Sequence, residues 1–199
     1  AAADPDPRAL KHVKMDREFF ALTWEKAHQD YIANFREINA YRKKGEIVID
    51  GNIDEPDWKN ADIVSRFTHE RNNELRIPEN EQTYVRIVYE PDYIYFAIEA
   101  MEPYPEKIVS NITQHDGPVW EDNTLEIFIS HPDMGESYYQ LIYNALGVCY
   151  DHLAKPVPFD KSFEAQGEFK TKVLHDRWVL EGRIPSDNLG EKCFDGQMW

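Results

Sequence analysis

Several features that define other protein classes are scarce in this sequence. It has two cysteines, Cys149 and Cys193, which are too few for a disulfide scaffold and lack the CxxC spacing of zinc or redox sites. Whether they pair stays open. No apolar run reaches the roughly 18 residues that a membrane-spanning helix needs, so we expect no membrane insertion. The start, AAADPDPRAL, lacks the apolar segment of a signal peptide, and a signal already removed would leave the same start.

Positive charge is also scarce. The chain has 22 basic and 37 acidic residues, which gives a net charge of -15. Such a surface repels nucleic acid phosphates and anionic membranes, so we expect no nucleic acid partner. The acidic balance suits neutral ligands or divalent cations, and simple solubility explains it equally well.

Catalytic and nucleotide-binding motifs are absent. The seven histidines form no HxH or HExxH pattern, and no GxSxG elbow, Walker loop or GxGxxG occurs. We therefore expect no nucleotide cofactor. His115 and Asp116 are neighbours in the sequence, and in a chain this acidic such a pair also arises by chance.

The sequence does contain a helical pattern near its start. Apolar residues recur at steps of three and four over residues 16–43, which predicts an amphipathic helix. Asp16 can cap its N-terminus and Gly45 can end it. Residues 1–45 are predicted to be an N-terminal helical segment, which docks on the rest of the chain or is the tail of an upstream domain. The stripe consists of Phe20, Trp24, Ala27, Tyr31, Phe35, Ile38 and Tyr41.

From residue 46 the apolar period changes to two, which is typical of strands. Short alternating segments are separated by Pro, Gly, Asn and Asp, and two of the connections, Glu90–Asp92 and Ala145–Gly147, are short enough for hairpins. Residues 46–199 are therefore predicted to form a mainly β domain, an antiparallel sandwich of the immunoglobulin-like or jelly-roll type. The predicted strands are 46–50, 83–90, 93–101, 123–130, 138–145, 147–153, 168–175 and 177–184.

The segment GPVWEDNTLEIFIS, residues 117–130, contains the first candidate site. In a strand, Leu125 and Ile127 point to one face, while Glu126 and Phe128 point to the other. Trp120 precedes this strand among carboxylates. It is either a plug at the edge of the core or an exposed platform for a ligand.

Acidic residues suggest two further kinds of site. A glycosidase needs two carboxylates at a defined separation, which Glu126 with Asp122 or Asp151 would supply. The segments IDGNIDEPD and HDGPVWEDN offer hard oxygen ligands for calcium, although acidic loop residues also serve as turn caps. The candidate calcium ligands are Asp50, Asp54, Glu55, Asp116 and Asp122.

Three segments together resemble the family-9 carbohydrate-binding modules. They are IVIDGNIDEPDWKNAD, TYVRIVYEPDYIYFAIEAMEP, and VWEDNTLEIFI followed by YYQLIYNALGVCYD and RWVLEGRIP. They span roughly residues 46–190 in the family's order. The resemblance implies a calcium-bearing β-sandwich appended to a secreted glycoside hydrolase. It thus implies a neutral oligo- or polysaccharide as ligand, an upstream catalytic domain as partner, and an extracellular, periplasmic or cell-surface location.

The resemblance also implies a site. A tryptophan at the position of Trp120 stacks on a sugar ring, and a glutamate at the position of Glu126 accepts bonds from its hydroxyls. Family binders carry an arginine where this chain has Ile142, and their second, late tryptophan has no counterpart up to Trp199. Gln140 and Asn144 lie on the same predicted strand face and are candidates for replacement contacts.

We therefore expect a non-catalytic carbohydrate-binding accessory module. The alternatives are the glycosidase described above and a structural accessory domain that no longer binds sugar. A more remote one is a haem-binding relative with Met101 and His115 as axial ligands, and we expect no haem.

Overall fold

The computed structural model describes residues 38–69, 72–155, 160, 162–193 and 195–197. The chain divides into two units, Ala1–Glu37 and Ile38–Trp199, and the second contains the sheets. Most of the predicted helix lies outside the described residues. Within the described part of the chain, no helix is long and apolar enough to cross a membrane.

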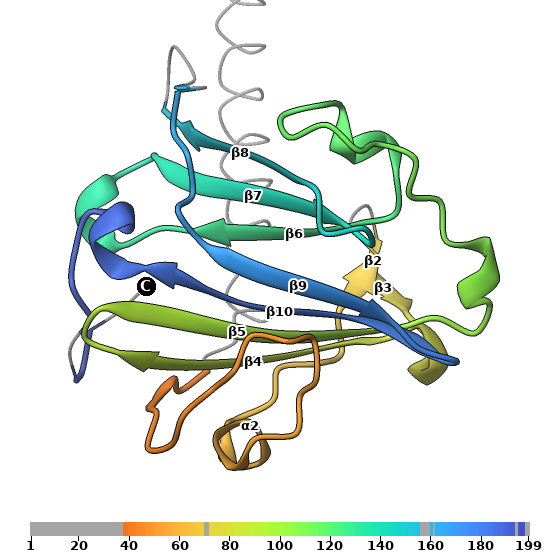
Figure 1. The fold of residues 1–199 in the computed structure, drawn as a ribbon, viewed down its shortest axis with the longest axis horizontal. Helices are drawn as coiled ribbons and strands as arrows, with labels where there is room; N and C mark the ends of the chain where they lie inside the picture. Colours follow the sequence, from red (N-terminus) through yellow and green to blue (C-terminus); the bar gives the residue numbers. More distant parts are fainter. Residues whose placement is uncertain (1–37, 70–71, 156–159, 161, 194, 198–199) are drawn as a thin grey trace, which may run out of the picture. The chain divides into compact units, whose positions relative to one another are not determined.

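Two sheets form a β-sandwich (Figure 1). The larger sheet has the order β1-β4-β5-β10-β9 and is antiparallel except where β1 joins β4, and the smaller antiparallel sheet has the order β6-β7-β8. The predicted sandwich is confirmed. The strands are β1 (Tyr41–Arg42), β4 (Thr83–Glu90), β5 (Tyr93–Met101), β6 (Thr124–Ile129), β7 (Tyr138–Asn144), β8 (Cys149–Ala154), β9 (Glu168–Val173) and β10 (Arg177–Pro185).

Both predicted hairpins occur. β4 and β5 pair up to Glu90 and Tyr93, so Pro91 and Asp92 form the tight turn. β7 and β8 pair up to Tyr143 and Cys149. Gly147 in their connection has a φ of 80°, a conformation that favours glycine.

The main core lies between the two sheets. Alternate residues of β5 and β10 pack against alternate residues of β6 and β7, as the period of two predicts. The buried residues with the least exposure here are Leu141, Leu180, Ile184 and Leu189.

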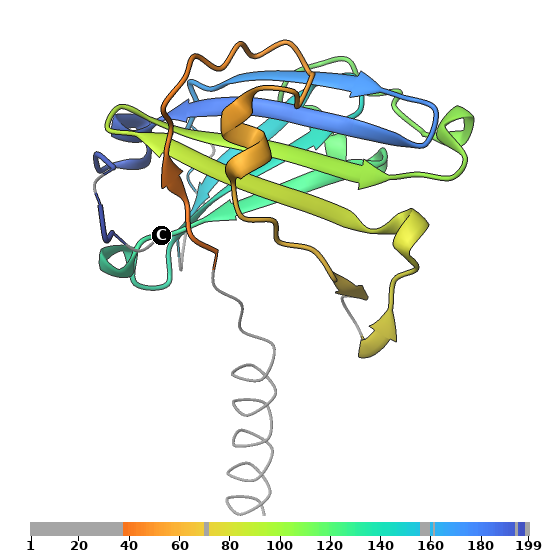
Figure 2. The same ribbon diagram turned by 90° about the horizontal axis from the view of Figure 1, so that it is seen from below.

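A second core lies on the outer face of the larger sheet, where residues 46–61 cross the sheet with α2 (Pro56–Asn60) (Figure 2). The predicted strand 46–50 is wrong. Its alternation is correct, because Ile47 and Ile49 are buried, but the segment lies on the face of the sheet instead of beside a strand. Its Val48 amide donates to Glu55, and its Asp50 amide donates to Glu181.

Two other local features differ from prediction. Residues 38–43 are not helical, because the chain is extended there and Tyr41–Arg42 pairs in parallel with β4. A hairpin of β2 (Thr68–His69) and β3 (Asn72–Arg76) was not predicted. The 3-10 turns are η1 (Glu79–Glu81), η2 (Pro105–Lys107), η3 (Val119–Glu121), η4 (Pro132–Met134) and η5 (Ser186–Leu189).

Candidate functional site

The outer face of the β6-β7-β8 sheet gathers aromatic and polar side chains. The register places Glu126, Ile142 and Tyr150 in one row across the three strands. The next row contains Phe128, Gln140 and His152. Alternation directs both rows away from the main core. We call this surface, with Trp120 and Tyr138, the aromatic face.

Trp120 lies at one end of the aromatic face. It is part of the short turn η3, and its side chain is 53% exposed. Its ring meets Tyr150 edge to face, with centroids 5.1 Å apart and planes at 85°. This geometry is favourable for aromatic pairs, so Tyr150 holds one side of the indole while the rest stays open. Trp120 is therefore an exposed side chain and not a plug at the edge of the core.

Polar side chains lie on the same face. Glu126 is exposed, and its Oε2 accepts a hydrogen bond of 2.9 Å from Nε2 of Gln140. The second carboxylate oxygen and the amide oxygen of Gln140 provide further acceptors. Ile142, where the resemblance predicts an arginine, is buried with 4% exposure between Glu126 and Tyr150. The middle of the face therefore lacks the donor that the arginine would provide.

A second aromatic pair occupies the other end of the face. Phe128 is 58% exposed, and its ring centroid lies 5.7 Å from that of Tyr138. Ile142 and Tyr138 are four residues apart on β7, which corresponds to about 13 Å along the strand. The sequence had placed Phe128 beside Glu126, but it had not indicated Tyr138, Tyr150 or His152. Their positions follow from the register across the strands.

The loop that carries Trp120 is fixed to the sheet by Asp122 and Asn144. Asp122 accepts bonds from the amides of Asn111 and Ile112 at 2.9 Å each, and from Nδ2 of Asn144. Burial raises the pKa of Asp122, but these hydrogen bonds outweigh it and hold the pKa below its usual range.

The structure gives Asn144 a role other than the predicted sugar contact. Its side chain is fully buried. Nδ2 donates to Asp122 and to the Ile112 carbonyl, while Oδ1 accepts from the amides of Leu146 and Val148. All of its hydrogen-bonding capacity is used, so Asn144 is not on the aromatic face.

The carboxylates of the glycosidase alternative do not form a pair. Asp151 lies opposite Leu141, on the core side of the sheet, whereas Glu126 points to the outer side. Asp122 is engaged by backbone amides. Two catalytic carboxylates must flank the same glycosidic bond, and Glu126 and Asp151 lie on opposite sides of the sheet.

The candidate calcium ligands lie in separate places. In the described ranges, only two groups of three metal-binding side chains come together, and Asp116 alone of the five candidates belongs to one. The carboxylate of Asp50 binds the amide and side chain of Asn52. Glu55 accepts from the Val48 amide through Oε1, and its buried Oε2 has no partner in the described part of the chain. The five residues therefore do not form one calcium site.

The segment around Asp50 is bound to the sheet by the side chain of Glu181. It is fully buried, and its carboxylate accepts bonds from the Trp58 indole at 2.9 Å and the amides of Asp50 and Gly51 at 3.0 and 2.9 Å. Burial raises its pKa, and these bonds offset part of that effect. Trp58 thus packs the opening turn on the sandwich.

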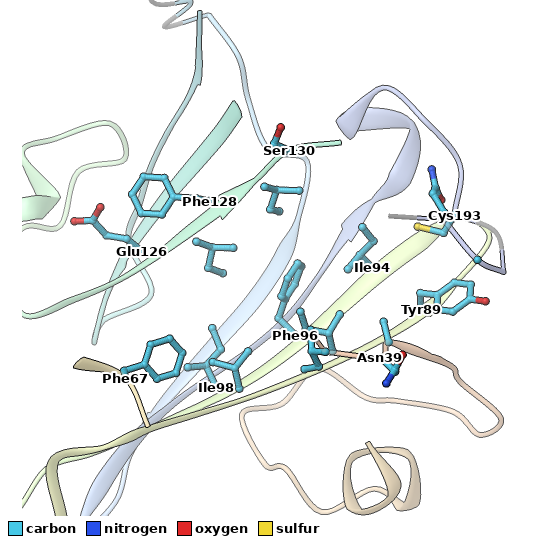
Figure 3. Close-up of a pocket in the computed structure, with 18 residues that line it drawn as sticks. Asn39, Phe67, Tyr89, Ile94, Phe96, Ile98, Glu126, Phe128, Ser130 and Cys193 are labelled. Carbon is cyan, nitrogen blue, oxygen red and sulfur yellow. The ribbon is translucent and has the colours of Figure 1, made fainter. Parts of the chain in front are cut away.

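A hollow also lies between the two sheets at the β4 and β6 edges, and Glu126 and Phe128 of β6 are among the residues around it. It has a volume of about 490 Å³ and a mainly apolar lining that includes Phe67, Phe96 and Ile98. Figure 3 shows Glu126 and Phe128 on the opposite side of β6 from Phe96 and Ile98. An apolar interior does not offer the polar groups that sugar hydroxyls need, so the aromatic face is the better candidate.

Both cysteines are buried free thiols. The haem alternative has no geometric support, since Nε2 of His115 bonds Glu164 and Met101 does not line the hollow next to His115.

Comparisons with known proteins match the sandwich as a whole. The family model described as carbohydrate family 9 binding domain-like matches residues 49–198. A family-9 carbohydrate-binding module from Caldicellulosiruptor kristjanssonii in complex with glucose has a TM-score of 0.54 and 16% identity, covering 79% of this chain and 72% of its own. The module from that organism in complex with cellotriose gives a TM-score of 0.51 and 16% identity, covering 79% and 71%. Among curated proteins, no sequence matches.

Proposed function

Because this chain belongs to the carbohydrate family 9 binding domain-like family, we propose that it is a non-catalytic carbohydrate-binding module whose ligand lies on the aromatic face. The observation that carries the proposal is Trp120, a half-exposed indole that contacts Tyr150, in the same row across the sheet as the exposed Glu126. A buried tryptophan would support only a structural role.

The chemistry of the face suits a pyranose. One face of a sugar ring presents C–H groups and is apolar, so it stacks on the Trp120 indole. The ring edge carries hydroxyls, which donate to the Glu126 carboxylate in charge-assisted hydrogen bonds. Gln140 orients that carboxylate and adds an amide oxygen as acceptor.

The second aromatic pair supports a ligand longer than one sugar. Tyr138 lies about 13 Å along β7 from the row of Glu126, and Phe128, two residues from Glu126 on β6, lies about 7 Å from it. A neutral oligosaccharide would span both aromatic ends, with Glu126, Gln140 and His152 between them.

The experiment is isothermal titration calorimetry with glucose, xylose and galactose and with their short oligosaccharides. We expect binding of at least one series, with oligosaccharide affinity above that of the monosaccharide. Trp120→Ala should abolish the heat signal, and Phe128→Ala should remove the advantage of the oligosaccharide alone. Val173→Ala, an exposed apolar residue on β9, is the matched control and should bind like the parent.

A structural accessory domain without sugar affinity is the second candidate. Ile142 favours it, because an apolar side chain fills the position where the resemblance implies a donor for the sugar. If the folded chain binds none of the sugars tested, it is a structural accessory domain.

The remaining parts of the proposal rest on the family alone. We place the module outside the cytoplasm, at the extracellular, periplasmic or cell-surface side, where polysaccharides occur. An attached glycan-processing enzyme is its proposed partner.

A further inference from the structure

A group of metal-binding side chains lies outside the aromatic face. Nε2 of His115 is 2.9 Å from Oε2 of Glu164 and 3.8 Å from Oδ1 of Asp116. The three ligand atoms all lie within 4.8 Å of one another, although the residues belong to two segments 49 positions apart. One imidazole nitrogen and two carboxylates are a ligand set that zinc accepts.

Exposed clusters of this kind are common without a metal ion. This cluster differs from them because the buried Asp151 lies next to it. Asp151 is 2% exposed, and its Oδ1 is buried without a hydrogen-bond partner in the described part of the chain. The Cys149 thiol donates to its Oδ2 at 3.4 Å, and the backbone amide of Ala165 also interacts with the carboxylate. A buried carboxylate with few hydrogen bonds is destabilising unless a positive charge lies nearby.

The buried carboxylate and the cluster share one hollow. Asp151 and His115 both line a cavity of about 310 Å³, together with Tyr143, Cys149 and Phe169. Asp151 extends from the core side of β8, so this cavity and the aromatic face are on opposite sides of the sheet. A ligand here would not compete with a sugar.

We propose that His115, Asp116 and Glu164 bind a divalent transition metal of the zinc type, with Asp151 as the buried negative charge behind them. The imidazole favours zinc over calcium, which takes oxygen ligands. Three carboxylates around one neutral imidazole exceed the charge of one divalent ion, so the ion also relieves their mutual repulsion.

The first test is titration calorimetry of the full chain with zinc chloride after removal of metals by a chelator. We expect saturable binding of one ion, and a cobalt-loaded chain should show visible absorption typical of tetrahedral coordination. His115→Ala and Glu164→Gln should each weaken zinc binding at least tenfold. Both side chains are more than half exposed, so the fold should survive.

Two histidines provide matched controls. His175 lies 3.8 Å from Asp176, and among the described residues no third metal-binding side chain joins this pair. His131 belongs to the other described group, with Asp133 and Glu191. His175→Ala and His131→Ala should leave zinc binding unchanged. Loss of binding in either one with retention in His115→Ala would overturn the proposal, as would no binding to the parent chain or a preference for calcium.

The buried charge has its own test. Asp151→Asn removes the charge with little change in shape, so the metal-free variant should melt at a higher temperature than the parent. Zinc should raise the melting temperature of the variant less than that of the parent. A lower melting temperature of the metal-free variant, or an equal zinc shift, would contradict the role assigned to Asp151.

Discussion

At the scale of single residues, exposure separates the tryptophans by role. Trp58 is 1% exposed and donates its indole N–H to a buried carboxylate, whereas Trp120 is 53% exposed and makes its described ring contact with Tyr150. A side chain that contributes little to the core is free to contact a ligand. Trp120 and Trp58 therefore form a natural pair for comparing binding with stability.

The first prediction concerns this pair. Trp120→Ala should lower the free energy of unfolding by no more than about 1 kcal/mol, the contribution of one aromatic contact, while it removes sugar binding. Trp58→Ala should cost about 3–5 kcal/mol, as for other buried aromatic residues. Urea unfolding followed by circular dichroism measures both. A loss of 3 kcal/mol or more in Trp120→Ala would show that Trp120 belongs to the core.

The second prediction concerns Glu126. Glu126→Gln keeps the size of the side chain but replaces a charged acceptor by an amide. Sugar affinity should fall by about 1.5–3 kcal/mol, the usual contribution of a hydrogen bond to a charged group, with little change in stability. Calorimetry at constant pH measures the affinity. The exposed Glu136→Gln is the control, and equal affinities of parent and Glu126→Gln would remove the carboxylate from the site.

At the scale of elements, side-chain hydrogen bonds hold the loop before β6 in place. Asp122 binds two amides of residues 111–112, and Asn144 of β7 binds both Asp122 and that loop. The platform is thus supported from the sheet below it. A change to these tethers should affect binding without any contact to the sugar.

Asp122→Asn tests this support. The neutral amide is a weaker acceptor for the amides of Asn111 and Ile112, so the free energy of unfolding should fall by about 1–3 kcal/mol. Sugar affinity should fall as well, because the position of Trp120 becomes less defined. Glu126→Gln should lower affinity alone. An Asp122→Asn variant with parental affinity would show that the loop needs no tether.

The larger sheet has its own polar connection. Glu99 of β5 accepts from Arg86 of β4 at 2.7 Å and from Arg177 of β10 at 2.6 Å. Burial raises the pKa of Glu99, yet the two guanidinium groups outweigh burial and hold it below the ordinary value. The carboxylate therefore stabilises the fold at neutral pH. That stabilisation is present above the unfolded pKa of about 4.3 and is lost as pH falls through the lower folded pKa.

Glu99→Gln should accordingly lower the free energy of unfolding at pH 7 by about 1–3 kcal/mol. It should also reduce the loss of stability of the parent between about pH 5 and pH 2, the acid range in which the carboxylate titrates. Urea titrations across this range measure the effect. Glu168→Gln breaks a more exposed pair with Arg183 and should change stability by less than about 1 kcal/mol. Parallel pH profiles of parent and Glu99→Gln would contradict this account.

At the scale of the whole molecule, alternation in the sequence was sufficient to predict the sandwich. The strands 83–90 and 93–101 agree with the structure because apolar residues at every second position need a buried face. The same alternation at 46–50 gave a wrong strand, because it shows that a segment is extended but not which groups its amides bind.

The site was predictable only in part, for a related reason. Trp120 and Glu126 are close in sequence, so local pattern indicated both. Tyr138 and Tyr150 join them through strand register, which one sequence does not reveal. Alternation predicted the same strand face for Asn144 as for Gln140. Asn144 is nevertheless buried, because the loop at residues 111–112 packs over it and accepts its hydrogen bond.

Net charge provides a prediction for the whole molecule. With 37 acidic and 22 basic residues the chain repels anions, while a neutral sugar has no charge to be attracted or screened. Sugar affinity should therefore stay constant between about 0.05 and 0.5 M salt. A steep salt dependence of calorimetric affinity would point to a charged ligand.

The central claim is that Trp120 is the sugar platform, and the indole N–H resonances of the chain test it most directly. The chain has five tryptophans, so a heteronuclear NMR titration with the best-binding oligosaccharide distinguishes among them. The account predicts that the Trp120 resonance, assigned by its loss in Trp120→Phe, shifts in a saturable manner while that of Trp58 stays in place. Saturable binding that leaves the Trp120 resonance unmoved would contradict it.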